Sequence, residues 1–283
     1  MKLKSFVLTA VLIITALLGG CSPKAESGKP IVAVSVVPQA AFAKAVCGDL
    51  WEVVTVIPPG SSPENYEPTV AERIKFEEAK LYFAVGVPAE ESRILPSLNQ
   101  GTKLIKQQEN VGEYYPDRIV EEGRDPHIWL SPKRAVVMVR VMAEEFSLAD
   151  PENKDSYYSN AEKYIAELNA LDEYITQKLS GLENKKMIVY HPAFGYLAED
   201  YGIEMYALQE GGRDATLRHM QEMADLAKRE NIKAVFYQAE TDSKQAEAFA
   251  QQIGGKAVML APLAENYCEN LKGMADLLAE MMK

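Results

Sequence analysis

The stretch "PENKDSYYSNAEKYIAELNALDEYITQKLSG" (151–181) has the spacing of one uninterrupted helix. Pro151 suits the first turn of a helix, and Gly181 suits its end. At 1.5 Å per residue the helix would span roughly 45 Å, which exceeds one small domain. We therefore expect it to run along two halves of the protein and to join them. The apolar residues that recur at helical steps of three and four are Ala161, Tyr164, Ile165, Leu168, Leu171, Ile175, Leu179 and Leu182.

Short β-rich runs alternate with helical segments on both sides of this stretch. Such alternation predicts parallel sheets with crossover helices. The expected fold class is therefore α/β, with two lobes of parallel sheet, one long bridging helix and a ligand cleft between the lobes. The expected strands are 31–36, 51–57, 81–86, 102–106, 186–190, 203–208, 232–237 and 256–261. The expected helices are 39–50, 69–80, 89–99, 133–146, 193–202, 215–230, 243–254 and 265–282, and residues 107–126 read as a polar loop.

The N-terminus has the pattern of an export signal. Lys2 and Lys4 precede an apolar run of about 13 residues, which is shorter than the roughly 20 that a membrane-spanning helix needs. Small residues then precede Cys21, as in the lipobox of bacterial lipoproteins. We expect residues 1–20 to be a signal peptide, Cys21 to be acylated, and 21–29 to be a tether that holds the protein at the outer side of the cell membrane.

The remaining boundaries follow from the pattern. We expect an N-terminal lobe at 30–150, the linking helix at 151–182, and a C-terminal lobe at 183–283. The formal net charge of −11 makes the chain a poor partner for nucleic acid. The sequence has no H-E-x-x-H pattern, no Cys/His cluster and no G-x-S-x-G turn, which argues against a zinc hydrolase or another enzyme.

Two of the three histidines stand beside prolines. His127 lies in "DPHIWLSP" (125–132), and His191 begins "HPAFGYLAEDYG" (191–202). His191 directly follows an expected strand, and ligands of open α/β sheets bind beyond the carboxyl ends of strands. The third histidine, His219, is expected on the side of a helix.

Three further side chains follow expected strands in the same way. Glu64 lies in "PPGSSPENYEP" (58–68), and Gln238 and Glu240 lie in "QAETDS" (238–243). Imidazole together with carboxylate oxygen is a common ligand set for zinc and a usable one for manganese. The predicted metal ligands are therefore His127, His191, Glu64, Gln238 and Glu240, with Glu210 as a weaker candidate.

These motifs, in this order after a lipobox, resemble the solute-binding lipoproteins of zinc and manganese ABC transporters, over about residues 30–283. The resemblance implies two Rossmann-like lobes bridged by a helix, with His127 and His191 as metal ligands. A histidine at the second position is typical of zinc-binding members. The chain departs from the family pattern at Glu64, where histidine is common, at Gln238, where glutamate is common, and at Ala261, where an acid is frequent.

The resemblance implies an extracytoplasmic binding protein that captures a divalent metal ion, with zinc favoured over manganese, and delivers it to an ABC permease. We expect a lipid-anchored monomer without enzymatic activity. Two alternatives remain open from the sequence: a protein of the same architecture that binds a siderophore or corrinoid complex, and a surface adhesin.

Overall fold

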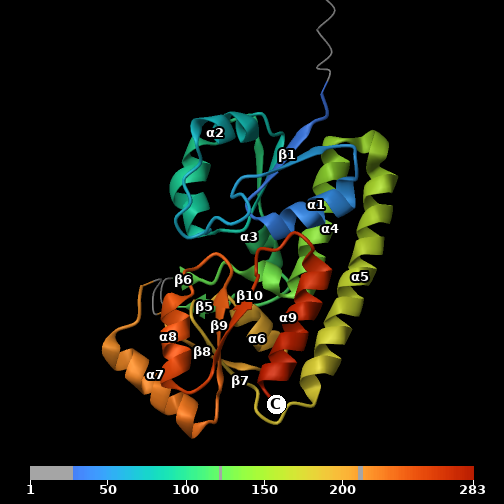
Figure 1. The fold of residues 1–283 in the computed structure, drawn as a ribbon. Helices are drawn as coiled ribbons and strands as arrows, with labels where there is room; N and C mark the ends of the chain where they lie inside the picture. Colours follow the sequence, from blue (N-terminus) through green and yellow to red (C-terminus); the bar gives the residue numbers. More distant parts are fainter. Residues whose placement is uncertain (1–27, 121–122, 210–212) are drawn as a thin grey trace, which may run out of the picture.

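The computed structural model describes residues 28–120, 123–209 and 213–283, so the predicted signal peptide, Cys21 and Glu210 lie outside the described residues. Each lobe contains a sheet of four parallel strands (Figure 1). The N-terminal sheet has the order β2-β1-β3-β4, with β1 (Ile31–Val34), β2 (Glu52–Thr55), β3 (Leu81–Ala84) and β4 (Lys103–Lys106). The C-terminal sheet has the order β10-β9-β7-β8, with β7 (Lys186–Val189), β8 (Glu204–Ala207), β9 (Ala234–Gln238) and β10 (Lys256–Leu260).

The two sheets have the same topology. In each lobe the first strand lies inside the sheet, the second is on one side of it, and the third and fourth follow on the other side. The predicted α/β class and all eight predicted strands are therefore confirmed, with boundaries that differ by one to three residues. The carboxyl ends of β2, β7 and β9 lead into the loops that carry the candidate ligands.

Helices cover the sheets and connect their strands. The N-terminal lobe has α1 (Val37–Cys47), α2 (Val70–Glu77), α3 (Gln107–Gly112) and α4 (Pro132–Ala149), and the C-terminal lobe has α6 (Gly195–Asp200), α7 (Leu217–Arg229), α8 (Lys244–Gln252) and α9 (Tyr267–Met281). Side-chain hydroxyls cap three of them: Thr69 begins α2, Ser131 begins α4, and Thr216 begins α7. Among the described residues, no helix is both long enough and apolar enough to cross a membrane.

Helix α5 (Lys154–Ser180) is the predicted bridge. Its 27 residues follow a short 3-10 turn at Pro151–Asn153, and it runs beside both lobes (Figure 1). It packs against α1 and α4 in the N-terminal lobe and against α9 in the C-terminal lobe. One continuous apolar core includes its buried face and residues of both lobes. The buried positions, at steps of three and four, are Tyr157, Ala161, Ile165, Leu168, Leu171, Ile175 and Leu179.

Two local predictions were wrong. Residues 107–126, expected to be a polar loop, contain α3 and a short hairpin of β5 (Ile119–Val120) and β6 (Gly123–Arg124). Helix α3 buries Gln107, whose amide oxygen accepts from Gln39 Nε2 at 2.8 Å and whose amide nitrogen donates to the Met138 carbonyl at 3.1 Å. Burial of a polar residue with both ends satisfied is invisible in a hydrophobicity pattern.

The second difference concerns the segment after β3. The expected helix at 89–99 is a π turn at Glu90–Ile94 followed by a 3-10 turn at Leu95–Ser97. Pro96 has no N–H to donate, so the segment cannot continue as a regular α-helix through this point.

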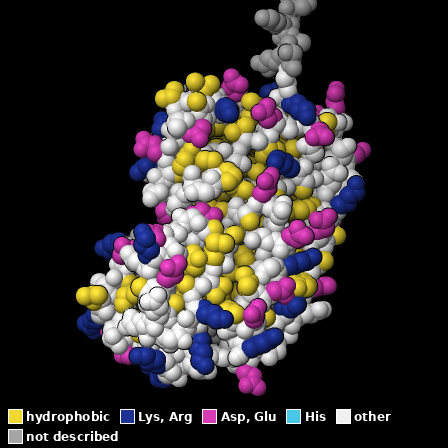
Figure 2. All heavy atoms as spheres, in the orientation of Figure 1, with side chains coloured by type: hydrophobic (Ala, Val, Ile, Leu, Met, Phe, Trp, Pro, Cys, Tyr) yellow, Lys and Arg dark blue, Asp and Glu magenta, His cyan; other side chains and the backbone are white. Residues whose placement is uncertain are grey.

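The surface agrees with the prediction from composition. On the face drawn in Figure 2, acidic and basic side chains are interspersed and no basic stripe is seen. The two described cysteines, Cys47 and Cys268, are free thiols. Cys47 is buried, and burial raises its pKa to about 11.

A buried ion pair connects α4 to the C-terminal lobe. Arg134 Nη1 lies 3.0 Å from Asp200 Oδ1, at the end of α6, and their side chains are only 3% and 9% exposed. The Arg134 guanidinium also lies over the Tyr196 ring, 4.4 Å from its centroid. Removal of one partner of such a pair leaves the other charge buried and uncompensated.

We expect Asp200→Ala to lower the free energy of unfolding by about 3–5 kcal/mol, because Arg134 would stay buried without its carboxylate. Urea unfolding followed by circular dichroism measures this. The matched control is Asp276→Ala, which removes a carboxylate 47% exposed in its pair with Lys178 and should change stability by about 1 kcal/mol or less. Equal losses in the two variants would contradict a structural role for the buried pair.

Candidate metal centre

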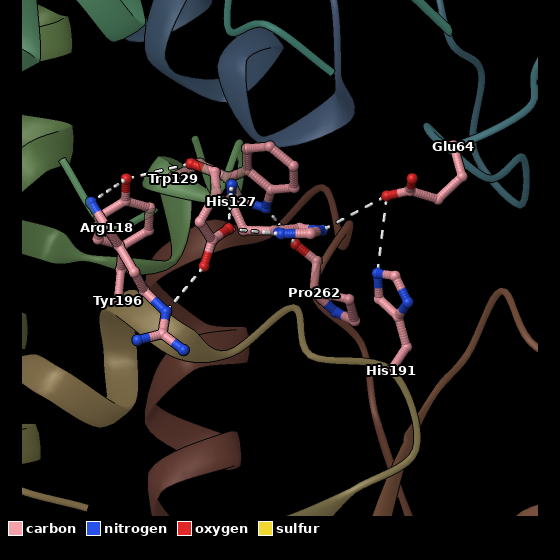
Figure 3. Close-up of polar contacts among 8 residues, drawn as sticks. Glu64, Arg118, His127, Trp129, His191, Tyr196 and Pro262 are labelled. Carbon is pink, nitrogen blue, oxygen red and sulfur yellow. Dashed lines mark hydrogen bonds and ion pairs between the residues drawn. The ribbon is translucent and has the colours of Figure 1, made fainter. Parts of the chain in front are cut away.

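Three loops bring two histidines and a carboxylate together. Glu64 comes from the loop after β2, His127 from the loop before α4, and His191 from the carboxyl end of β7. Glu64 Oε1 lies 3.6 Å from His191 Nε2 and 4.0 Å from His127 Nε2, and the three ligand atoms lie within 4.8 Å of one another. Both imidazoles point toward the Glu64 carboxylate (Figure 3).

This spacing is close to that of a bound zinc ion. Tetrahedral zinc with bonds of about 2.0–2.1 Å holds its ligand atoms roughly 3.3 Å apart. The distances from Glu64 to the two histidines are slightly longer, so a small movement of this side chain would complete the geometry. The two imidazole rings are 5.5 Å apart at their centroids and inclined by 73°, which lets both Nε2 atoms face one point.

Asp125 orients His127. Its Oδ1 accepts a hydrogen bond from His127 Nδ1 at 2.8 Å and another from the His127 backbone N–H at 3.0 Å. The proton therefore resides on Nδ1, and the lone pair of Nε2 is free for a metal. Asp125 is buried, and its other oxygen pairs with Arg118 Nε at 3.1 Å. This is the carboxylate–histidine arrangement that raises the basicity of a ligating imidazole.

Gly195 makes room for this arrangement. A Cβ at this position would lie 2.0 Å from Arg118 Nε and 2.7 Å from Asp125 Oδ2. Any side chain would therefore displace the guanidinium from the carboxylate that supports His127.

His191 is oriented by a neutral partner. Its Nδ1 lies 3.0 Å from Gln209 Oε1, which can only accept, so Nδ1 carries the proton and Nε2 is again the free lone pair. The Gln209 amide donates in turn to Asp214 Oδ1 at 3.4 Å. The two imidazoles thus present the same nitrogen to Glu64 but differ in what supports them, a carboxylate for one and an amide for the other.

We expect Gln209→Leu to lower zinc affinity by about tenfold or more, because groups that orient a ligating histidine typically contribute 10- to 100-fold. Competition with a chromophoric chelator measures the change. The control is Gln221→Leu, an exposed glutamine on α7 whose amide donates to Asp225. If both variants bind zinc as the original chain does, the amide does not set the tautomer of His191.

Electrostatics couple Glu64 to His191. Burial alone would raise the pKa of Glu64, but the hydrogen bond from His191 and the charges of both histidines lower it below 4.5. Burial alone would lower the pKa of His191, but the hydrogen bond and charge of Glu64 raise it above 6.5. A proton shared by this pair occupies the position that a metal ion would take.

Apolar and aromatic groups enclose the ligands on one side. Trp129 is fully buried, its ring lies 5.2 Å from that of His127, and its indole N–H donates to the Pro262 carbonyl at 3.0 Å. On the other side a cavity of about 620 Å³ opens between the lobes, which gives a metal ion a route in. Its walls include the three ligands together with Gly86, Pro88, Gln108, Arg124 and Pro192.

The other predicted ligands lie at the edge of the cluster. Gln238 is buried in the wall of the small cavity that Glu64, His127 and His191 also line. Glu240 lines a neighbouring cavity, does not join the ligand cluster, and burial raises its pKa. His219 lies on α7, where its Nε2 is 2.9 Å from the Ala207 carbonyl oxygen.

The sequence analysis missed the residues that support the histidines: Asp125, Arg118, Gln209 and Gly195. Asp125 could have been found, because an acid two residues before a predicted ligand can fold back onto it. Gln209 is 18 residues from His191 and has no such signal.

Comparisons with known proteins agree with this geometry. The family model "Zinc-uptake complex component A periplasmic" matches residues 32–281. The high-affinity zinc uptake system protein ZnuA of Bacillus subtilis is 28% identical over 278 residues, which cover 91% of this chain and 87% of that protein. The zinc-binding lipoprotein AdcA of Streptococcus pneumoniae is 28% identical over 298 residues, which cover 99% of this chain but 59% of AdcA. The crystal structure of a ZnuA deletion mutant with zinc bound has a TM-score of 0.85 and 30% identity, covering 90% of this chain and 99% of that one.

Proposed function

Because this chain belongs to the family of periplasmic zinc-uptake component A proteins, we propose that it captures a zinc ion outside the cytoplasm and delivers it to an ABC permease. The observation that carries the proposal is the convergence of Glu64, His127 and His191 within 4.8 Å. Two imidazoles and one carboxylate suit zinc, whereas manganese prefers a larger share of oxygen ligands. Zinc is therefore the favoured cargo and manganese the alternative.

Capture follows from the charges of the site. An arriving zinc ion displaces the proton held between His191 and Glu64 and binds the freed Nε2 atom and the carboxylate. His127 is already in the required tautomer because of Asp125. The dry wall formed by Trp129 strengthens the attraction between the ion and its ligands, because a low local dielectric reduces screening.

The site favours a bare ion over a metal complex. Three protein ligands leave one position of a tetrahedral zinc ion open, and a small molecule such as water can fill it. A siderophore or corrinoid already occupies most positions of its metal and would leave Glu64, His127 and His191 without a role. The family consists of transport binding proteins and not of enzymes, and we propose that this chain likewise binds its metal without turnover.

The proposal includes an anchor and a domain plan. We propose that residues 1–20 are removed, that Cys21 is acylated, and that 21–29 tether a monomer to the membrane. The lobes are proposed at 30–150 and 183–283, with 151–182 between them. Metabolic labelling with a radioactive fatty acid should mark the original chain, and Cys21→Ser should abolish the label.

Direct titration tests the proposed cargo. The chain, stripped of metal with a chelator, is titrated with zinc and with manganese in competition with an indicator of known affinity. We expect one zinc per chain and an affinity for zinc at least about 100-fold above that for manganese, since two imidazole ligands favour zinc. Binding of manganese with equal or greater affinity, or no stoichiometric binding of zinc, would contradict the proposal.

A further inference from the structure

The loop that carries His127 is bonded to the C-terminal lobe. We call residues 116–131 the His127 loop. The phenol of Tyr196, on α6, donates to the Asp125 carbonyl at 3.1 Å and accepts from the Arg118 backbone N–H at 3.1 Å. Asp125 and Arg118 are the two residues that support His127, so α6 holds the support of this ligand at two points (Figure 3).

Two further contacts attach the other end of the His127 loop to the same lobe. The Trp129 indole donates to the Pro262 carbonyl at 3.0 Å, and the Tyr267 phenol, on α9, donates to the Trp129 carbonyl at 2.7 Å. Ser131 bonds to Asp200 at the end of α6. Although the loop precedes α4 in the chain, its polar contacts are to α6, α9 and the segment after β10.

The Glu64 loop is bonded to the N-terminal lobe instead. The Pro63 carbonyl accepts from the Ala89 N–H at 3.0 Å, and the Asn65 carbonyl accepts from Arg93 Nη1 at 2.9 Å. The segment that contains Ala89 and Arg93 is fixed in turn by Glu90. The buried Glu90 carboxylate accepts from the backbone N–H groups of Val85 at 3.1 Å and Gly86 at 2.6 Å, and from the Ser35 hydroxyl.

Within the described residues, the polar contact between the His127 loop and the N-terminal lobe is the ion pair of His127 with Glu64, at 4.0 Å. His191 belongs to the C-terminal lobe through β7. The two imidazoles are therefore held by one lobe and the carboxylate by the other, although His127 precedes the linking helix in the sequence.

We propose that Tyr196, with Trp129 and Tyr267, keeps His127 and His191 together as a pair on the C-terminal lobe, and that Glu64 is the ligand exchanged when the lobes separate. This rests on the proposed function and specifies how the site opens. Separation withdraws the only anionic ligand of the cluster and leaves the ion on two neutral imidazoles. Closure returns Glu64, and the metal is then held from both lobes.

Distances between spin labels test which lobe carries the His127 loop. Labels are placed in pairs at Ile74→Cys on α2, Ile119→Cys in the His127 loop and Lys228→Cys on α7, three exposed positions. The full chain carries Cys21→Ser, Cys47→Ala and Cys268→Ser to remove the other thiols. We expect zinc to change the 74–228 and 74–119 distances and to leave the 119–228 distance constant. A constant 74–119 distance with a changing 119–228 distance, or no change in any pair, would overturn the proposal.

A second experiment tests Tyr196 as a positioning residue. Tyr196→Phe removes both phenol bonds to the His127 loop and should lower zinc affinity about tenfold, in the range of other groups that orient metal ligands. With cobalt as a spectroscopic probe, the visible absorption bands of the tetrahedral site should lose intensity. The control is Tyr201→Phe, which removes a phenol bond to Asp172 on α5 and should leave both affinity and spectrum unchanged.

The outcomes separate this inference from the proposed function. If the original chain fails to bind zinc, the function itself is wrong. If it binds zinc but Tyr196→Phe keeps the cobalt spectrum and the affinity of the original chain, only the attachment of His127 to the C-terminal lobe is refuted.

Discussion

His127→Ala should lower the affinity for zinc by roughly 100- to 1,000-fold. A zinc site of four ligands contributes about 10–16 kcal/mol in favourable cases, so one ligand accounts for roughly 3–4 kcal/mol, which is two to three powers of ten in the dissociation constant. His127 is buried and supported by Asp125, so water replaces it poorly. Calorimetry, or competition with a chromophoric chelator, measures the change.

Glu64 and His219 provide the comparisons. Glu64 is 35% exposed, and water can take its place on the metal, so Glu64→Ala should weaken binding by a smaller factor, about 10- to 100-fold. His219→Ala removes the histidine that lies outside the cluster and should leave the affinity unchanged. If Glu64→Ala binds zinc like the original chain, the assignment of the loop after β2 to the site is wrong.

The second large effect is expected with pH. Zinc binds neutral imidazole, and Glu64 raises the pKa of the His191 imidazole above 6.5 even though burial alone would lower it. As the pH falls through that raised pKa, protons compete with zinc and the affinity should drop about tenfold per pH unit for one proton. Competition titrations between pH 8 and pH 5.5 measure this slope.

Glu64→Gln is the informative variant for the pH dependence. It removes the charge that raises the pKa of His191, so burial then dominates and the decline in affinity should begin at a lower pH than in the original chain. An unchanged onset of the decline would show that the Glu64–His191 pair does not control proton competition.

The same pair gives the metal-free chain a different pH dependence. The raised pKa of His191 contributes stability that is complete below about 6.5 and is lost as the pH rises through the raised value. The lowered pKa of Glu64 contributes stability that is present above about 4.5 and is lost as the pH falls through the lowered value. Both contributions are present between these limits, so mild acid favours the proton-bound site while it weakens zinc binding.

The sequence predicted the parts of the fold that depend on local pattern. The strands and the bridging helix follow from apolar periodicity, because each buries one face. Helix α3 could not be predicted in this way, since Gln107 is buried through amide bonds to Gln39 and Met138, which are far from it in the chain.

The candidate site divides along the same line. Glu64, His127 and His191 each follow or precede an expected element, and the structure brings their ligand atoms together as predicted. The support of His191 by Gln209, and of the His127 loop by Tyr196, depends on contacts between separate segments. For that reason the sequence placed His127 in the N-terminal lobe, while its hydrogen bonds attach it to the other.

The apolar core that continues from one lobe through α5 into the other has a consequence for denaturation. Neither half has a core of its own that is closed off from its neighbour, so we expect heat to melt the chain in a single cooperative transition. Zinc at the cleft would then raise the melting temperature of the entire chain, by an increment that grows with the logarithm of its free concentration.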